Sequence, residues 1–66
     1  MRVFVNGEPR DCDLGLTIAD LIERHRLVPE TTLVEQNGIA LPRREWKNRS
    51  LRENDRLEIL SVASGG

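Results

Sequence analysis

The sequence predicts an α+β domain in which a mixed β-sheet of four to five strands packs on one helix. Three observations support this fold class. Stretches that alternate between apolar and polar residues occur near both ends of the chain, Asn-Gly pairs follow two of the extended stretches, and one stretch with helical periodicity lies between them. A chain of 66 residues has room for a single domain, which we assign to residues 1–66.

The first predicted element is a β-hairpin. Residues 2–5 alternate between charged or aromatic and apolar side chains, and Asn6-Gly7 follows directly. This dipeptide favours the positive backbone angles of a two-residue hairpin turn. We expect the returning strand at residues 9–12, where Pro9 is tolerated because the first position of a strand can lack a ladder donor.

A helix is predicted from Thr17 to about residue 26. Thr17 and Asp20 have the spacing of a capping box, in which each side chain accepts a hydrogen bond from the backbone of the other residue. An apolar stripe at i, i+3, i+4 and i+7 follows. Its members are Ile18, Leu21, Ile22 and His25. Pro29 limits the helix, because the residue before a proline avoids helical angles.

The second half of the chain predicts three further strands. Residues 31–36 are extended, Asn37-Gly38 turns the chain, and residues 39–41 form a short strand that Pro42 ends. Residues 43–50 are polar except for Trp46, which indicates a loop with room for one helical turn, pinned to the sheet by the buried indole. Residues 56–62 alternate again and predict the last strand.

This order of elements predicts a ubiquitin-like β-grasp fold, because a crossover helix after a hairpin allows the last strand to return beside the first. Alternation then divides the apolar residues of the first and last strands between two faces. Those facing the helix are Val3, Val5, Leu57 and Ile59, and those facing away are Phe4, Leu60 and Val62. The second set predicts an exposed apolar patch that binds a partner. Scattered exposure, as in most small proteins, is the alternative.

Charge and composition exclude several classes of function. Ten basic and eleven acidic residues are interspersed and leave a formal net charge of −1, which favours neither nucleic acid nor a membrane as a partner. No apolar run approaches the ~20 residues of a membrane span, and residues 1–10 lack the apolar core of a signal peptide, so we expect a cytoplasmic protein. One cysteine and one histidine predict no metal site and no bound cofactor.

Three features invite a catalytic interpretation, and each has a structural one that we prefer. Cys12 lies in a predicted strand, which favours an ordinary structural cysteine over a sulfur-bearing one. His25 ends the apolar stripe without a nucleophile near it in the sequence, as expected at the edge of a core. The basic run that includes Arg43 and Arg44 fits a solvated loop. With no nucleophile and base at a suitable spacing, we expect that the chain is not an enzyme.

The terminal Gly65-Gly66 is the strongest functional candidate. Residues 63–66 have no bulky side chain, and such a segment can enter a narrow active site of another protein. The group delivered there is the α-carboxylate of Gly66. A carboxylate is a poor electrophile, so it needs activation, most simply as an acyl adenylate made from ATP. A sulfur nucleophile that displaces AMP then leaves a thiocarboxylate. A frayed end without function is the alternative.

The chain resembles the ThiS family over essentially its whole length. The resemblance is carried by Asn6-Gly7, by Thr17 at the start of the helix, by the segment ALPRREW at residues 40–46, by ENDRLEIL at residues 53–60 and by the terminal diglycine. Asn54 departs from the family pattern, which usually has glycine before the aspartate. Asparagine also tolerates the left-handed conformation.

The resemblance implies a sulfur carrier of thiamine biosynthesis. A ThiF-like enzyme would adenylate Gly66 with ATP and magnesium, and a cysteine desulfurase relay would supply sulfur. The thiocarboxylate would then give its sulfur to a thiazole synthase. In this scheme Gly66 carries the sulfur, and Gly65, which has no side chain, fits a narrow active site. Phe4, Leu60 and Val62 would contact the partner.

Two other functions are compatible with the sequence. One is a carrier with the same chemistry in another pathway that needs sulfur, such as the synthesis of molybdopterin, of an amino acid or of a natural product. The other is a noncovalent β-grasp interaction module whose glycines are incidental.

Overall fold

The structure, a computed structural model, describes residues 1–62 and contains five strands, one α-helix and two 3₁₀ helices. The strands are β1 (Arg2–Val5), β2 (Glu8–Asp11), β3 (Thr32–Gln36), β4 (Ile39–Leu41) and β5 (Arg56–Ser61). The helix α1 spans Ile18–Arg24, and the 3₁₀ helices are η1 (Pro29–Thr31) and η2 (Arg43–Asn48). The predicted order of hairpin, helix and three strands is confirmed.

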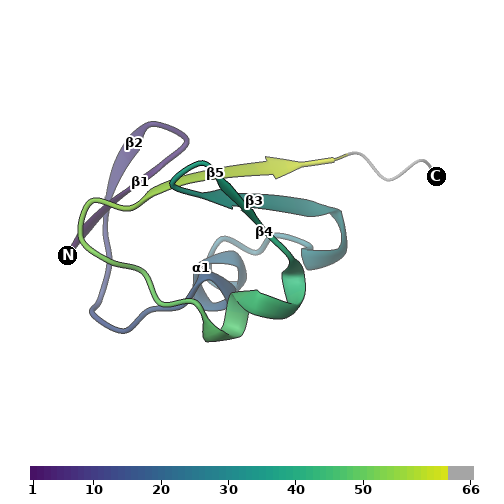
Figure 1. Ribbon diagram of the computed structural model, residues 1–66, viewed down its shortest axis with the longest axis horizontal. Helices are drawn as coiled ribbons and strands as arrows, with labels where there is room; N and C mark the ends of the chain where they lie inside the picture. Colours follow the sequence, from purple (N-terminus) through teal and green to yellow (C-terminus); the bar gives the residue numbers. More distant parts are fainter. Residues whose placement is uncertain (63–66) are drawn as a thin grey trace.

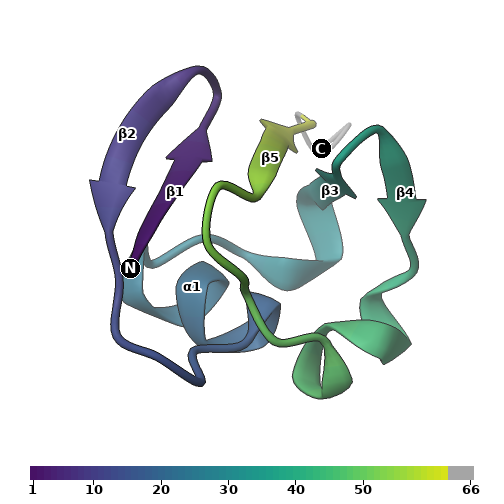
Figure 2. The ribbon, with the colours of Figure 1, turned by 60° about the vertical axis from the view of Figure 1, so that its left-hand side comes forward.

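The five strands form one mixed sheet in the order β2-β1-β5-β3-β4. β5 pairs parallel with β1 and antiparallel with β3, so the last strand in the sequence lies at the centre of the sheet. Figure 1 shows α1 and η2 together on one side of the sheet, and Figure 2 shows the strands curving around α1. This is the β-grasp arrangement that the sequence predicts.

The core lies between the sheet and α1. The side chains of Val3, Ile18, Ile22 and Leu57 are at most 2% exposed, and Ile59 packs against this cluster while partly buried. The predicted division of the strands into an inner and an outer face is therefore confirmed. Burial of one such aliphatic side chain contributes about 1.5–3 kcal/mol.

The two Asn-Gly turns have the predicted geometry. Asn6 and Gly7 have φ values of 51° and 84°, as a two-residue turn with both central angles positive requires. This tight turn places Glu8 directly opposite Val5, so β2 begins one residue earlier than the predicted residues 9–12. Cys12 lies just beyond β2, although its backbone N–H still donates to the Met1 carbonyl at 2.8 Å.

The end of α1 differs from the prediction. The helix ends at Arg24 rather than at residue 26, because Arg26 has a φ of 55° and turns the chain out of the helix. The Leu27 N–H donates to the Ile22 carbonyl at 3.1 Å and the Arg26 N–H to the Glu23 carbonyl at 3.0 Å, which together form a Schellman motif. Leu27 packs against the core, a contact that frequently accompanies this motif.

His25 is exposed, so its assignment to the apolar stripe was wrong. Its ring Nδ1 lies 2.9 Å from the carbonyl oxygen of Leu21 and in this way satisfies one of the last carbonyls of the helix.

Trp46 fixes the long segment between β4 and β5, as predicted. The segment forms the 3₁₀ helix η2, which is longer than the single turn expected, and the indole is 3% exposed. The Trp46 Nε1–H donates to the Leu41 carbonyl at 3.1 Å. Farther along, the Leu51 N–H donates to the Leu16 carbonyl at 2.8 Å, which ties the chain to the start of α1.

Asp55 is a buried carboxylate that organises the turn before β5. It is 6% exposed and accepts hydrogen bonds from Gln36 Nε2 at 2.9 Å, Asn37 Nδ2 at 3.0 Å and the Arg52 backbone N–H at 2.8 Å. Burial raises the pKa of Asp55, but the hydrogen bonds lower it further than burial raises it, and the pKa lies below its usual value of 3.8. Asn54 has a φ of 68°, in the left-handed conformation expected for it.

We predict that Asp55→Asn lowers the free energy of unfolding by about 2 kcal/mol, because the amide NH2 replaces one of the two acceptor oxygens and then faces a donor, either that of Asn37 or those of Gln36 and Arg52. Chemical denaturation at neutral pH measures the loss. Because the folded-state pKa is depressed, the stabilisation by Asp55 is fully present above the unfolded pKa near 3.8 and is lost as the pH falls through the lower folded-state value.

Asp11→Asn is the matched control, because Asp11 is an exposed carboxylate on β2. We expect it to unfold within about 0.5 kcal/mol of the wild type. Equal stabilities of the two variants between pH 3 and pH 7 would contradict the role of Asp55.

We further predict that Arg26→Gly raises the free energy of unfolding by about 0.5–1 kcal/mol, because glycine adopts a positive φ without the steric cost of a Cβ atom. Thermal unfolding of the two proteins measures the gain. The control is Glu23→Gly inside α1, which we expect to destabilise by about 1 kcal/mol. A loss of stability in Arg26→Gly would show that the arginine side chain matters more than the backbone angle.

Candidate functional site

The outer face of the sheet carries an apolar patch at the end of β5. Leu33, Leu60 and Val62 are 57%, 60% and 43% exposed, and Leu33 lies directly opposite Leu60 on the neighbouring strands β3 and β5. We call these three residues the outer patch. Leu60 and Val62 are on the predicted face. Leu33 was missed, although the alternation of residues 32–36 could have assigned it to the same face.

Phe4 lies on the outer face but outside this patch, which corrects the prediction that it joins Leu60 and Val62. The register places Phe4 opposite Arg56, four residues before Leu60 along β5. At about 3.3 Å per residue, that is a separation of about 13 Å along the strand. The half-buried Phe4 instead lines a hollow of about 340 Å³ together with Gly7, Arg56 and Glu58.

Two carboxylates lie between Phe4 and the outer patch. Glu35 of β3 and Glu58 of β5 are exposed and directly opposite each other. Like charges in opposed positions destabilise a sheet. With Leu33 and Leu60 the two carboxylates line a shallow hollow of about 420 Å³. The outer face therefore combines exposed apolar side chains with a negative pair that does not stabilise the fold.

The end of β5 is held by hydrogen bonds on both of its edges. The Val62 N–H donates to the Thr31 carbonyl at 2.7 Å. On the other edge, the side-chain amide of Asn6 donates to the Ile59 carbonyl at 3.1 Å and its Oδ1 accepts from the Ile59 N–H at 2.7 Å. These contacts fix the chain up to Val62. Gly65 and Gly66, the predicted reactive residues, lie outside the described residues.

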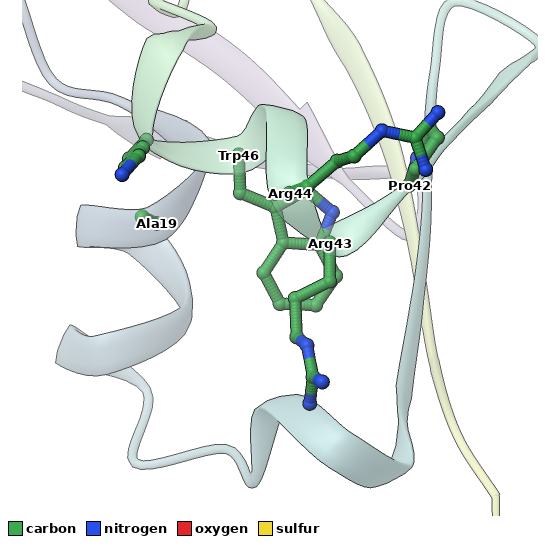
Figure 3. A pocket seen from close by; sticks show the side chains of 6 residues that line it. Ala19, Pro42, Arg43, Arg44 and Trp46 are labelled. Atoms are coloured by element: carbon green, nitrogen blue, oxygen red, sulfur yellow. The ribbon is translucent and has the colours of Figure 1, made fainter.

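The basic run on η2 surrounds a shallow hollow above Trp46. Ala19 of α1, Arg43 and Arg44 line it with the indole, and Figure 3 shows both arginine side chains directed away from Ala19. Arg43 lies 3.7 Å from Glu30, and Arg49 lies 3.2 Å from Glu45. All four of these charged side chains are more than a third exposed, as in the solvated loop that we expected.

The other candidate residues do not form a catalytic centre within residues 1–62. Cys12 is half-buried and packs against the core, which supports the structural interpretation. The described part of the chain contains no group of three or more His, Cys, Asp or Glu residues that could hold a metal ion. Its helices are also too short or too polar to cross a bilayer.

Comparisons with known sequences agree with this geometry. The model of the ThiS family matches residues 3–66. The whole chain is 30% identical to a segment of a thiazole synthase from Magnetococcus marinus, of whose length it spans only about a fifth (20%). It is also 31% identical to the uncharacterized protein ycf40 of Pyropia yezoensis, of which it covers 93%.

Solved structures give the same result. The crystal structure of the thiamine biosynthesis protein ThiS from Geobacter metallireducens matches the whole chain over its own full length, with a TM-score of 0.84 and 29% sequence identity. A solution structure of a thiamine biosynthesis protein from the same organism matches with a TM-score of 0.81, with 88% of that chain covered and the same identity. The family model that matches residues 3–66 and the fold shared with these structures lead to one conclusion: the chain belongs to the ThiS family.

Proposed function

We propose that the protein is a sulfur carrier of thiamine biosynthesis whose C-terminal Gly66 is adenylated and converted to a thiocarboxylate. The observation that carries the proposal is the match to the ThiS family, which runs through residue 66 and so includes both glycines. In this role the protein is a co-substrate that is regenerated after each transfer and not a catalyst.

The proposed chemistry has three steps. A carboxylate oxygen of Gly66 attacks the α-phosphorus of ATP on a ThiF-like enzyme, which also binds magnesium, and pyrophosphate leaves. A thiol reduces the persulfide of a cysteine desulfurase relay, which forms a disulfide and releases hydrosulfide. The hydrosulfide attacks the acyl carbon and displaces AMP, which leaves the thiocarboxylate. The terminal sulfur is then the nucleophile that a thiazole synthase incorporates. Gly65 has no side chain that could clash inside a narrow active site.

The outer face supports docking of an enzyme beside the tail. The outer patch lies at the end of β5, with Val62 four residues from Gly66 in the sequence. Exposed apolar residues rimmed by charge are typical of interaction sites. We propose a thiazole synthase as the occupant, because the relative of that name includes a segment similar to this whole chain within its own polypeptide.

The opposed pair Glu35 and Glu58 gives the proposed docking face a negative charge. A basic side chain of the partner, placed between the two carboxylates, would relieve their repulsion and bind there. Phe4 lies on the far side of Glu58 from the outer patch and extends the proposed surface. The alternatives, a carrier for another pathway or a noncovalent module, remain outcomes of the experiments below.

We predict that the chain gains one sulfur in exchange for one oxygen when it is incubated with ATP, magnesium, a ThiF-like enzyme and a sulfide source. Intact-mass measurement detects the exchange. Deleting Gly66, or adding an alanine after it, should lower the rate at least ~100-fold, because either change misplaces the reacting carboxylate.

Ser64→Ala is the control for the Gly66 variants, since it also alters residues 63–66 but keeps the terminal carboxylate in place. We expect it to form the thiocarboxylate at the wild-type rate. Undiminished sulfur delivery by the chain that lacks Gly66 would favour the noncovalent module. Sulfur transfer to a molybdopterin precursor, and not to a thiazole, would assign the carrier to the other pathway.

We also predict that Glu58→Gln raises the free energy of unfolding by about 0.2–0.5 kcal/mol while it weakens binding to a thiazole synthase, because it removes both the repulsion from Glu35 and an attraction to the partner. Chemical denaturation and calorimetric titration measure the two effects. Glu23→Gln on the exposed face of α1 is the control and should change neither. If Glu58→Gln and the wild type bind the thiazole synthase equally well at low ionic strength, the acidic pair does not lie in the interface.

A further inference from the structure

The two edges of β5 are occupied unequally along its length. In an antiparallel pair, the backbone groups of alternate residues point toward the partner strand. The backbone groups of Arg56 and Val62 point toward β3, where they bond to Asn37 and Thr31. By alternation, the backbone groups of residues 58 and 60 also point toward β3. The backbone groups of residues 57, 59 and 61 therefore point away from β3, toward the edge where β1 lies.

This second edge is filled only as far as Ile59. The Leu57 carbonyl accepts from the Asn6 N–H at 2.8 Å, and the backbone groups of Ile59 bond to the side-chain amide of Asn6. The chain then turns away at Gly7 into β2. Figure 1 shows β5 continuing past the β1–β2 turn, with β3 beside it. Within residues 1–62, the N–H and C=O of Ser61 thus face an open edge of the sheet.

A groove lies beside this open edge on the inner side of the sheet. It has a volume of about 410 Å³. Its apolar lining is buried or half-buried, and consists of Val5, Leu27 and Ile59. Five exposed polar residues also line it, namely Asn6, Glu8, Arg10, His25 and Ser61. Arg10 and Glu8 form an ion pair of 3.2 Å. An extended strand placed beside Ser61 could insert one apolar side chain into this groove, because alternate side chains of a strand point to the same face.

We propose that the open edge at Ser61 is a β-addition site for an extended segment of the enzyme that adenylates Gly66. The segment lies in the line of β1, beyond Asn6, and exchanges main-chain hydrogen bonds with Ser61. It directs one apolar side chain into the groove between Leu27 and Ile59. This inference rests on the proposed function, since it identifies how the tail is held for activation.

Residues 63–66 explain why recognition uses the main chain. They are Ala-Ser-Gly-Gly and offer an enzyme almost no side chain to bind. Backbone groups are then the main source of specific contacts, and pairing at Ser61 sets the register of the five residues that follow. Five residues span at most about 17 Å, so an enzyme strand beside Ser61 lies within reach of the adenylation site. A wrong register of one residue would shift the carboxylate by more than 3 Å.

A second copy of the chain fits the edge less well. Two copies related by a twofold axis would pair their described edges only through Ser61, which gives a contact of two hydrogen bonds. Stable interfaces bury about 800 Å² on each partner, far more than such a contact. The outer patch lies on the opposite face of the sheet from the groove and adds nothing to this pairing.

Ser61→Pro tests the proposal. Proline removes the N–H that faces the open edge but removes no bond to β3, so the variant should fold and give the same circular dichroism spectrum as the wild type. Loss of one intermolecular hydrogen bond should lower kcat/KM for thiocarboxylate formation by about 5- to 10-fold. Ser61→Ala keeps the N–H and is the matched control for the backbone change, so it should retain most of the rate that Ser61→Pro loses.

A semisynthetic chain in which an ester replaces the amide between Leu60 and Ser61 removes the same N–H without the proline ring. If Ser61→Pro does not fold, the ester variant still measures the effect of losing this N–H. We expect the ester to show the same 5- to 10-fold loss. Wild-type rates in the ester, or equal losses in Ser61→Pro and Ser61→Ala, would overturn the proposal and leave the proposed function standing.

Two further outcomes separate the alternatives. If neither the wild type nor Ser61→Ala forms a thiocarboxylate, the proposed function itself fails, and the inference fails with it. If sedimentation equilibrium shows a wild-type dimer that Ser61→Pro dissociates, the edge pairs two copies of the chain, and the proposal of an enzyme strand is wrong.

Discussion

The parallel pairing of β1 with β5 is the constraint on which the remaining structure depends. It brings the first strand beside the last one and places β5 at the centre of the sheet. Because β3 occupies the other edge of β5, all three strands must align against α1 for Val3 and Leu57 to be buried. The side-chain contacts of Asn6 and Asp55 then secure the two ends of this arrangement, one at Ile59 and the other before Arg56.

Most of the fold could be predicted because local signals and tertiary contacts agree. The Asn-Gly turns, the capping box at Thr17 and the alternation of the strands each depend on neighbouring residues, and each is found in the structure. The end of α1 could not be predicted in the same way. Helical periodicity extends to His25, but the decisive feature is the left-handed conformation of Arg26, which side-chain chemistry does not favour and which the packing of Leu27 stabilises.

The candidate site was only partly predictable. Alternation gives the face of a side chain, and the outward positions of Leu60 and Val62 followed from it. The register between paired strands determines which side chains are neighbours on a face. This register depends on pairing between strands that are far apart in the sequence. For this reason Phe4 was grouped with the wrong residues, and the opposition of Glu35 and Glu58 was not foreseen. The same holds for the open edge at Ser61, which exists only because β1 stops at Val5.

The central position of β5 also determines when the domain can fold during synthesis. A strand that comes last in the chain but lies in the middle of the sheet leaves its neighbours without their main partner until it is translated. β1 and β3 each lack the strand that pairs with one of their edges until β5 has been made and has left the ribosome. Because the sheet closes only with these long-range contacts, a chain that lacks β5 cannot form the outer face that we propose as a docking surface. The topology thus couples the synthesis of β5 to the formation of the outer face that we propose as the docking surface.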